Sequence, residues 1–433
     1  MARVSKIRVL QVITRLIRGG AQREVLELLA GLDRRRFRVA LACHPQAQWV
    51  KRGAALANAF YPITDLVRPI SPGRDLQATI HLLRLMRRER CDIVHTHTSK
   101  AGILGRLAAR AAHVPVIVHT PHGTVFHESF LTPRMQRIIA RVERMSARWT
   151  DCIITKSDYE ADEYVQRGIA PRSKFPTIHS GLDFSRLDFV GGSPQAVRER
   201  IGATDGRPIV LYPARFVPEK DHASFLRAFA IVADHIPDAM AVLAGDGPLR
   251  SKVEAASLIQ RGALLSLGFC DDLPDLMRSA NVCVSASLTE GLPLTVAEAL
   301  ALGCAVVATD AGGTREVVLN GETGVLVPCA DPKALAAGIL HLLQHPEEAA
   351  RMAQAGREHV RPLFDARLMV KRTEQLYEEC LARKGLAAGV PSLGAQAGEE
   401  SLKPSRRPPC GARARGTDSS LAGGGRPERS GLT

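Results

Sequence analysis

The stretch NVCVSASLTEGLPLTVAEALALG, residues 281–303, joins a short apolar run to a helical pattern through a polar loop. A continuous apolar run is typical of a strand that is buried on both faces. Gly291 permits close approach of the backbone, Pro293 suits a first helical turn, and Gly303 stops the helix. A buried strand that leads directly into a helix is the repeating unit of a parallel α/β sheet.

The same unit recurs along the chain. The apolar runs are KIRVLQVIT, RVALACH, DIVHTHT, VPVIVHT and DCIITKS in the first half, and PIVLYPAR, AMAVLAGDG, ALLSLGF, NVCVSAS, CAVVATD and TGVLVPC in the second. Helical patterns separate them. Because 433 residues exceed one ordinary domain, the pattern predicts an α/β protein with two Rossmann-like, doubly wound parallel sheets.

Composition along the chain indicates where these domains end. Glycines and Pro194 between residues 181 and 195 mark a linker, so we expect a first domain over residues 1–184 and a second over residues 185–361. A last long helix is expected over residues 362–385, beginning near Pro362. From residue 386 to residue 433 the chain has no aromatic residue, and the sequence predicts a disordered tail there.

The 9 cysteines include no C-x-x-C pair, which favours reduced thiols and a cytoplasmic location. Arg15 and Arg18 break the N-terminal apolar run, and this argues against a secretory signal. No uncharged run approaches the roughly 18 residues that a membrane span needs.

Positive charge is concentrated in the first half of the chain. Residues 1–184 hold 30 Lys and Arg against 15 Asp and Glu, whereas residues 185–385 hold 21 against 25. Such an excess favours an anionic partner: a membrane, a nucleic acid or a phosphorylated substrate. Aromatic residues make up only 4% of the chain and no nucleic-acid-binding module is recognisable, so we expect no nucleic-acid partner.

Two acids flank the helix start in the opening stretch. Glu290 lies in the loop, and Glu298 lies nearly two turns into the helix. A helix start favours phosphate, so acids beside it should contact neutral hydroxyls instead. A nucleoside-diphosphate sugar has this layout of ribose, two phosphates and a second sugar. Arg215 and Lys220, at the end of an earlier strand, would supply cations for the phosphates, and no Asp-x-Asp triplet of the kind that holds a metal ion occurs.

Several motifs agree in order with one known family. These are RGGAQREV, DIVHTHTSKAGILGRLAAR, HTPHG, PARFVPEKD, AGDGP and the Glu290/Glu298 pair. Over roughly residues 6–380 the chain resembles the retaining nucleotide-sugar glycosyltransferases of family four, which have the two-domain GT-B architecture. Within that family it is similar to bacterial enzymes of capsule, exopolysaccharide and lipopolysaccharide synthesis.

The resemblance implies site residues at matching positions. Catalytic roles would fall on His122, Glu290, Arg215 and Lys220. Donor-binding roles would fall on Gly20, Arg215, Lys220, Glu290, Gly291, Leu292, Leu294 and Glu298, with Glu290 on the sugar hydroxyls and Glu298 on the ribose. The last helix would cross back onto the first domain. One departure from the family pattern is Gln22, where many relatives have an acid.

The resemblance also implies the reaction. A hexosyl or N-acetylhexosaminyl group would pass from a UDP- or GDP-sugar to a glycan acceptor carried on polyprenyl diphosphate, with retention at the anomeric carbon. The departing phosphate oxygen could take the acceptor proton, so positioning and charge stabilisation would be the main tasks of the protein. No metal and no other cofactor is expected.

A basic helix is predicted in TPRMQRIIARVERMSARW, residues 132–149. Its arginines recur at steps of three and four, which suits an anionic bilayer surface, and they are Arg134, Arg137, Arg141, Arg144 and Arg148. The chain would then attach peripherally to the inner face of the cytoplasmic membrane. The alternative is an ordinary surface helix that packs its apolar side, with Met135 and Ile138, on the domain.

Other interpretations stay open at this stage. Glu290 could cap a helix, Glu298 could be an exposed helix residue, and Arg215 with Lys220 could be a solvated surface pair. A metal site is a further possibility because several histidines lie together in the first half, although no Cys or carboxylate completes a recognisable spacing; they are His95, His97, His119, His122 and His127. At the level of function, the alternatives are a transferase with a soluble acceptor such as a sugar phosphate, and a non-catalytic nucleotide-sugar-binding protein.

Overall fold

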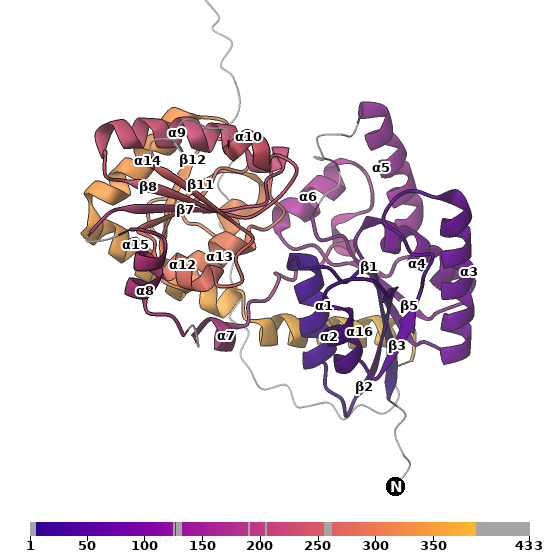
Figure 1. The fold of residues 1–433 in the computed structure, drawn as a ribbon. Helices are drawn as coiled ribbons and strands as arrows, with labels where there is room; N and C mark the ends of the chain where they lie inside the picture. Colours follow the sequence, from indigo (N-terminus) through magenta and orange to yellow (C-terminus); the bar gives the residue numbers. More distant parts are fainter. Residues whose placement is uncertain are drawn as a thin grey trace, which may run out of the picture. The chain divides into compact units, whose positions relative to one another are not determined.

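The first of two six-stranded parallel sheets is formed by the first half of the chain (Figure 1). A computed structural model of the protein describes residues 6–123, 126, 132–188, 191–203, 206–254 and 262–386. His127 and residues 387–433, which include almost all of the predicted tail, lie outside these ranges. The first sheet has the order β3-β2-β1-β4-β5-β6. Its strands are β1 (Ile7–Arg15), β2 (Phe37–His44), β3 (Ala59–Pro62), β4 (Ile93–His97), β5 (Val116–Thr120) and β6 (Cys152–Ile153).

Apolar helix faces cover both sides of this sheet. On one side lie α1 (Gly20–Gly31), α2 (Val50–Leu56) and the last helix, α16 (Ala366–Arg383). On the other side lie α3 (Pro72–Glu89) and α4 (Ser99–Ala111), and α5 (Pro133–Ala147) packs on α4. A buried ion pair between Arg106 and Glu143, with 2.7 Å between Nη2 and Oε2, joins α4 to α5. The helix α6 (Asp158–Gln166) follows β6.

The second sheet repeats this topology, with the order β12-β11-β10-β7-β8-β9. Its strands are β7 (Ile209–Pro213), β8 (Met240–Ala244), β9 (Leu264–Gly268), β10 (Val282–Ser285), β11 (Ala305–Thr309) and β12 (Val325–Val327). The longer helices are α9 (His222–His235) and α14 (Pro332–Gln344) on one face, and α8 (Pro194–Arg200), α12 (Leu273–Ser279) and α13 (Leu294–Ala301) on the other. The helix α15 (Pro346–Leu363) contributes buried residues to the cores on both faces. Short helices are α7 (Phe184–Asp188), α10 (Arg250–Glu254) and the 3₁₀ turns η2 (Arg172–Lys174), η3 (Pro218–Lys220) and η4 (Gly312–Glu316).

The predicted fold class is therefore confirmed: two doubly wound parallel sheets with helices on both faces. In each sheet the strand order reverses between the first and fourth strands, β1/β4 and β7/β10, and ligands of such sheets bind at the carboxyl ends of the strands beside this reversal. The limits predicted for the two domains stay predictions, because the described residues up to Leu386 belong to one compact unit.

The start of the last helix was predicted wrongly. The structure continues α15 through Pro362 to Leu363 and begins α16 at Ala366. Asp365 sets the new start, because its side chain accepts a hydrogen bond of 2.7 Å from the backbone N–H of Arg367. Figure 1 shows α16 beside α1, on which it packs.

Among the described helices, none has both the length and the apolar character that crossing a bilayer requires.

Candidate active site

Glu290 lies in the loop after β10, at the reversal point of the second sheet. The Ser287 hydroxyl donates to its Oε1 atom over 2.7 Å. The ammonium group of Lys220, from the loop after β7, bonds to the same oxygen. Two residues that are far apart in the sequence are thus brought together because β7 and β10 are neighbours.

Arg215 lies two residues after the end of β7 and is exposed. Within the described part of the chain, no carboxylate pairs with its guanidinium group. Arg215 lies on the same segment after β7 as Lys220, and an exposed cation without a described carboxylate partner is available to a ligand with negative charge.

Glu298 lies on α13 and is buried, so it is not the exposed helix residue of the alternative interpretation. Its carboxylate pairs with Arg23 of α1, which the sequence analysis did not single out. The start of α1 lies against the start of α13, since a Cβ atom on Gly20 would be 3.4 Å from Cδ1 of Leu294. The structure therefore places Gly20, Leu294 and Glu298 together.

Two adjacent glycines after β11 pack against the backbone of the Glu290 loop. Gly312 has φ +55°, and a Cβ atom there would lie 1.9 Å from the carbonyl oxygen of Glu290. A Cβ atom on Gly313 would lie 2.2 Å from the carbonyl oxygen of Gly291, and the N–H of Gly313 donates to Glu290 O over 3.1 Å. The motif AGGTRE was not identified from the sequence, although two glycines directly after a buried strand are a signal of close backbone approach.

The first half of the chain touches the same loop from its other side. A Cβ atom on Gly291 would lie 3.1 Å from Cα of Gly123, in the HTPHG segment. The Ser157 hydroxyl, at the start of α6, donates to Gly291 O over 2.7 Å. The loop with the predicted donor-sugar residues is therefore enclosed by segments of both sheets.

His122 has a left-handed backbone conformation, with φ +62°. Thr98, after β4, has φ +64°. Strained residues of this kind collect at functional sites. The His122 ring is directed into the protein: its Nε2 lies 2.9 Å from Nδ1 of His97, and its Nδ1 lies 3.8 Å from Oε2 of Glu24. Burial lowers the pKa of His122 well below its usual value, and the nearby Lys156 ammonium lowers this pKa further.

A chain of buried hydrogen bonds continues from His97. Its Nε2 lies 2.7 Å from Oε1 of Gln11, and the Gln11 amide donates to the hydroxyl of Tyr377 over 3.1 Å. This hydroxyl lies 2.6 Å from Nδ1 of His95, whose Nε2 lies 2.7 Å from the hydroxyl of Thr120. Burial lowers the pKa values of both histidines well below the usual range. Tyr377 thus ties α16 to the interior of the first sheet.

Three further charged residues lie buried beside His122. Glu24 accepts from the Lys156 ammonium over 2.6 Å and from the Ser180 hydroxyl over 2.8 Å. Glu160 accepts the backbone N–H groups of Gly123 (2.9 Å) and Lys156 (2.7 Å), and burial raises its pKa to about 7. Glu24 is more than a hundred positions away from Lys156 and Glu160, so no spacing pattern connects it to them and the sequence analysis missed this group.

Glu24, His97 and His122 could hold a metal ion, since each offers a ligand atom and these atoms lie within 4.8 Å of one another. No recognisable sequence spacing connects Glu24 to these histidines, and the structure brings it to them through α1. However, both Glu24 oxygens already accept hydrogen bonds, and one of these comes from the Lys156 ammonium. A cation at this distance repels a metal ion, so the donor set fits a hydrogen-bond network better than a metal site.

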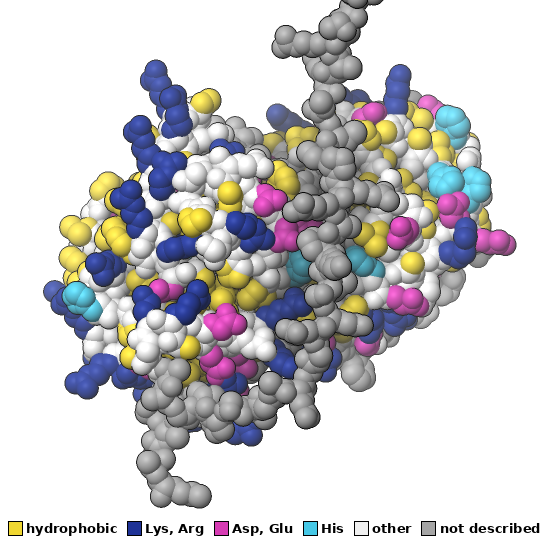
Figure 2. All heavy atoms as spheres, turned by 180° about the vertical axis from the view of Figure 1, so that it is seen from behind, with side chains coloured by type: hydrophobic (Ala, Val, Ile, Leu, Met, Phe, Trp, Pro, Cys, Tyr) yellow, Lys and Arg dark blue, Asp and Glu magenta, His cyan; other side chains and the backbone are white. Residues whose placement is uncertain are grey.

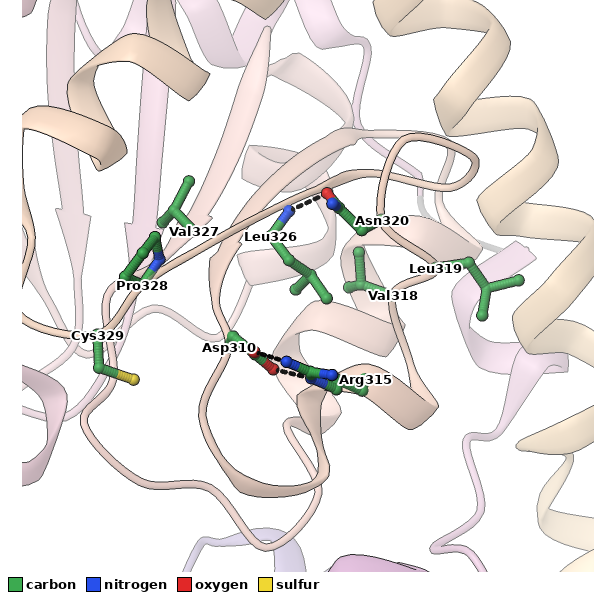
Figure 3. Close-up of a pocket in the computed structure, with 9 residues that line it drawn as sticks. All are labelled: Asp310, Arg315, Val318, Leu319, Asn320, Leu326, Val327, Pro328 and Cys329. Carbon is green, nitrogen blue, oxygen red and sulfur yellow. Dashed lines mark hydrogen bonds and ion pairs between the residues drawn. The ribbon is translucent and has the colours of Figure 1, made fainter. Parts of the chain in front are cut away.

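A separate hollow of about 690 Å³ lies at the β11–β12 edge of the second sheet (Figure 3). Figure 3 shows the Arg315 guanidinium group paired with Asp310 on one side, and the Asn320 amide bonded to the backbone of Leu326 on the other. Because the charges of this pair cancel, the hollow offers no free cation to a phosphate. None of the predicted site residues lines it.

The basic helix is α5, and its five predicted arginines are exposed: Arg134, Arg137, Arg141, Arg144 and Arg148. Three apolar side chains between them are exposed as well, Met135 by 41%, Ile138 by 59% and Met145 by 47%. Figure 2 shows Lys and Arg side chains projecting from the half of the molecule that carries this helix. Basic and apolar side chains are therefore interleaved on one surface, instead of lying on opposite faces as the ordinary surface helix requires.

Comparison with known proteins identifies the family to which the two sheets belong. Residues 18–186 match the family model "Glycosyltransferase Family 4", and residues 195–359 match the model "Glycosyl transferases group 1". The chain is 33% identical over 286 residues to the putative glycosyltransferase EpsD of Bacillus subtilis, and this match covers 64% of the chain and 74% of EpsD.

Two further relatives differ in the acceptor that their names give. One is the UDP-Gal:alpha-D-GlcNAc-diphosphoundecaprenol alpha-1,3-galactosyltransferase of Escherichia coli, 29% identical over 332 residues, or 76% of this chain and 85% of that protein. The other is the D-inositol 3-phosphate glycosyltransferase of Streptomyces avermitilis, 31% identical over 288 residues, or 62% of this chain and 61% of that protein.

Solved structures share the fold at lower identity. Anabaena Alr3699/HepE in complex with UDP-glucose has a TM-score of 0.74 and 20% identity over 86% of this chain and 100% of that one. The sucrose-phosphate synthase of Thermosynechococcus elongatus has a TM-score of 0.72 and 23% identity, over 87% of this chain and 100% of that one.

Proposed function

Because the chain belongs to the family-four glycosyltransferases and uses a nucleotide sugar, we propose that it transfers a hexosyl or N-acetylhexosaminyl group, with retention, from a UDP- or GDP-sugar to a polyprenyl-diphosphate-linked glycan. The observation that carries this proposal is the meeting of Lys220 and Glu290 at the reversal point of the second sheet, with the exposed Arg215 on the same segment as Lys220.

In the proposed donor complex, the diphosphate lies against Arg215 and Lys220. When Lys220 turns to a phosphate oxygen, one oxygen of Glu290 becomes free to accept from sugar hydroxyls. Glu298 binds the ribose hydroxyls, and the backbone of Gly291, Leu292 and Leu294 lines the path between the two acids. UDP and UDP-glucose are bound to Anabaena HepE, and this supports UDP-sugars as the first donors to test.

In the proposed mechanism, the bond between the anomeric carbon and the phosphate oxygen breaks as the acceptor oxygen approaches from the same face. The acceptor proton passes to the departing phosphate oxygen, so no protein carboxylate forms a covalent bond with the sugar. Arg215 and Lys220 stabilise the charge that develops on the leaving group. Two side-chain cations at this position support a reaction without a metal ion.

The catalytic role expected of His122 stays a prediction. Both its ring nitrogens are directed at protein groups, His97 and Glu24. We therefore assign it the task of holding the HTPHG turn against Gly291, where the acceptor would approach the donor sugar.

The acceptor assignment is supported by two observations. One relative is named for an acceptor linked to diphosphoundecaprenol. In addition, α5 presents arginines and exposed apolar side chains on one surface, as expected of a helix that lies on an anionic bilayer. A peripheral position on the cytoplasmic membrane follows from this proposal.

A soluble acceptor is the second candidate, because other relatives are named for D-inositol 3-phosphate. In that case the positive charge of the first half would serve a phosphorylated substrate. A non-catalytic binding protein is a weaker candidate, because Arg215, Lys220, Glu290 and Glu298 are all present.

The experiment is to incubate the purified protein with UDP- and GDP-sugars in EDTA, offering either a polyprenyl-diphosphate-linked N-acetylhexosamine or a sugar phosphate. NMR of the product gives the anomeric configuration. Transfer with retention to the lipid-linked acceptor supports the proposal. Transfer only to the sugar phosphate supports the second candidate, inversion contradicts the mechanism, and loss of transfer in EDTA contradicts metal independence.

A further inference from the structure

The carboxylate of Glu298 is already occupied in this structure. Nη1 of Arg23 donates to its Oε1, and the side chain of Glu298 is only 11% exposed, against 38% for Arg23. The electrostatic attraction of Glu298 is the main cause of a raised pKa at Arg23. Ribose hydroxyls therefore cannot reach Glu298 unless the Arg23 side chain moves.

Arg23 has donors to spare for a second partner. Its Nε atom is buried, and the described residues offer that atom no hydrogen-bond acceptor. Arg23 lies in the first turn of α1, which contains no acidic residue, and Gly20 of the same turn contacts Leu294. The Arg23 guanidinium group therefore lies against α13, the helix that follows β10, and the diphosphate is expected in the crevice at the carboxyl ends of these strands.

The crevice holds two matched pairs of opposite charge, Lys220 with Glu290 and Arg23 with Glu298. A ligand with hydroxyl groups at its two ends and a diphosphate between them can replace both pairs at once. The acids then accept from hydroxyls, and the cations then bind phosphate oxygens. Arg23 would be the counterpart of Lys220 on the opposite side of the ligand.

We propose that Arg23 is a donor-binding residue that exchanges partners: ribose hydroxyls take over the Glu298 carboxylate, and the guanidinium group turns to the diphosphate. This inference rests on the proposed function, since it requires a nucleoside diphosphate in the crevice. It adds a phosphate ligand from the first sheet, and it makes release of Glu298 a step in donor binding.

The exchange predicts opposite effects on two probes. Removal of the Arg23 side chain frees Glu298, so uridine, which has no phosphate, should bind at least as tightly as before. UDP should bind about 10- to 100-fold more weakly, because a charge-assisted hydrogen bond to phosphate is lost. If Arg23 only fastened the two halves of the chain together, its removal would weaken uridine and UDP alike.

The test is calorimetric titration of wild type, Arg23→Ala and Arg23→Lys with uridine and UDP, and with guanosine and GDP. Arg23→Lys keeps a charge but not the planar fork, so its UDP affinity should be intermediate. Arg8→Ala is the matched control: Arg8 pairs with Asp92 at a similar exposure of 39%, but at the amino end of β1, away from the crevice. That variant should leave both affinities unchanged.

The outcomes separate the two proposals. A diphosphate-to-nucleoside affinity ratio that falls at least tenfold in Arg23→Ala supports the exchange. An unchanged ratio, with wild type still binding the diphosphate, overturns the role of Arg23 and leaves the donor site intact. If wild type binds none of the four probes, the donor site itself is contradicted and the role of Arg23 with it. Melting temperatures of each variant show whether it is folded.

Discussion

Lys220 and Glu290 form an ion pair at the carboxyl ends of the two central strands of the second sheet, with the ammonium group on the carboxylate oxygen that Ser287 also binds. The Lys220 ammonium group balances the negative charge of the Glu290 carboxylate. The pair also places a cation where it can turn to a diphosphate.

Arg215→Ala should lower kcat/KM by about 10²- to 10³-fold, by analogy with the loss of one donor to a developing negative charge. The melting temperature should hardly change, because the Arg215 side chain is exposed and no described carboxylate pairs with it. Steady-state kinetics and thermal melting check both parts. Arg351→Ala, which removes an exposed arginine of α15, is the control; equal activities of the two variants would contradict the assignment of Arg215.

Gly312→Ala should impair donor binding. A methyl group at this position would overlap the carbonyl oxygen of Glu290, at 1.9 Å, and displace the loop. Gly321→Ala is a matched control, because Gly321 also has a positive φ, +79°, but open space around its Cβ position. Both variants bear a backbone strain of about 1–2 kcal/mol, and only Gly312→Ala should raise KM for the donor. Similar KM values in both variants would show that the loop tolerates the displacement.

Reversal of charge on α5 should detach the protein from anionic membranes. Each basic residue near such a surface contributes about 1 kcal/mol, so the double variant Arg137→Glu, Arg141→Glu should bind vesicles that contain phosphatidylglycerol roughly 30-fold or more weakly. Vesicle sedimentation at low and high salt measures this. The control changes the same charge elsewhere, with Arg351→Glu and Lys371→Glu, which are exposed on α15 and α16. Equal sedimentation of both double variants would contradict a bilayer contact through α5.

Acid should destabilise the protein through its buried histidines. Burial lowers the pKa values of His95, His97, His119 and His122 well below the usual value of 6.5. Below about pH 6.5 the unfolded chain therefore binds protons that the folded protein does not, and stability is lost as the pH falls. Glu160, with a pKa raised to about 7, has the opposite effect on the pH dependence of stability. Its contribution to the free energy of unfolding is present at low pH and is lost as the pH rises from about 4.5 to about 7.

The histidine effect can be measured by denaturant unfolding at pH 7.5 and pH 5.5. In His97→Gln one titrating group is gone, so the loss of unfolding free energy between these two pH values should be about 1.4 kcal/mol smaller than in wild type. The comparison uses the difference between pH values, so a general destabilisation by the substitution does not affect it. Equal losses in the two proteins would show that His97 is protonated in the folded state.

The sequence predicted the features that depend on neighbouring residues in the chain: the strands, and the loop or helix on which each site residue lies. Continuous apolar runs gave the strands, and the ends of β7 and β10 placed Lys220 near Glu290 because parallel strands deliver their loops to one edge. The position of Glu298 on a helix followed from the pattern around it. These inferences need only residues within about ten positions of one another, together with the rule for doubly wound sheets.

The partners of these residues could not be predicted in the same way. Arg23 meets Glu298 across 275 positions, and Lys156 meets Glu24 across 132. Such contacts depend on how α1 lies against α13 and against the end of β6, which no spacing rule gives. The start of α16 was misplaced for a local reason: Pro362 is accommodated in the last turn of α15, and Asp365 provides the cap.

The most direct test of the central claim is the release of nucleoside diphosphate by purified wild type and Glu290→Gln from UDP- and GDP-sugars in EDTA, with a polyprenyl-diphosphate-linked acceptor present. We expect release by wild type from sugars of one nucleotide, dependent on the acceptor, and a loss of about 10²-fold or more in Glu290→Gln, since a group that holds the reacting sugar is changed. Equal release by the two proteins would contradict the placement of the donor sugar at Glu290. No release from any donor, by wild type that is folded, would contradict sugar transfer at this site.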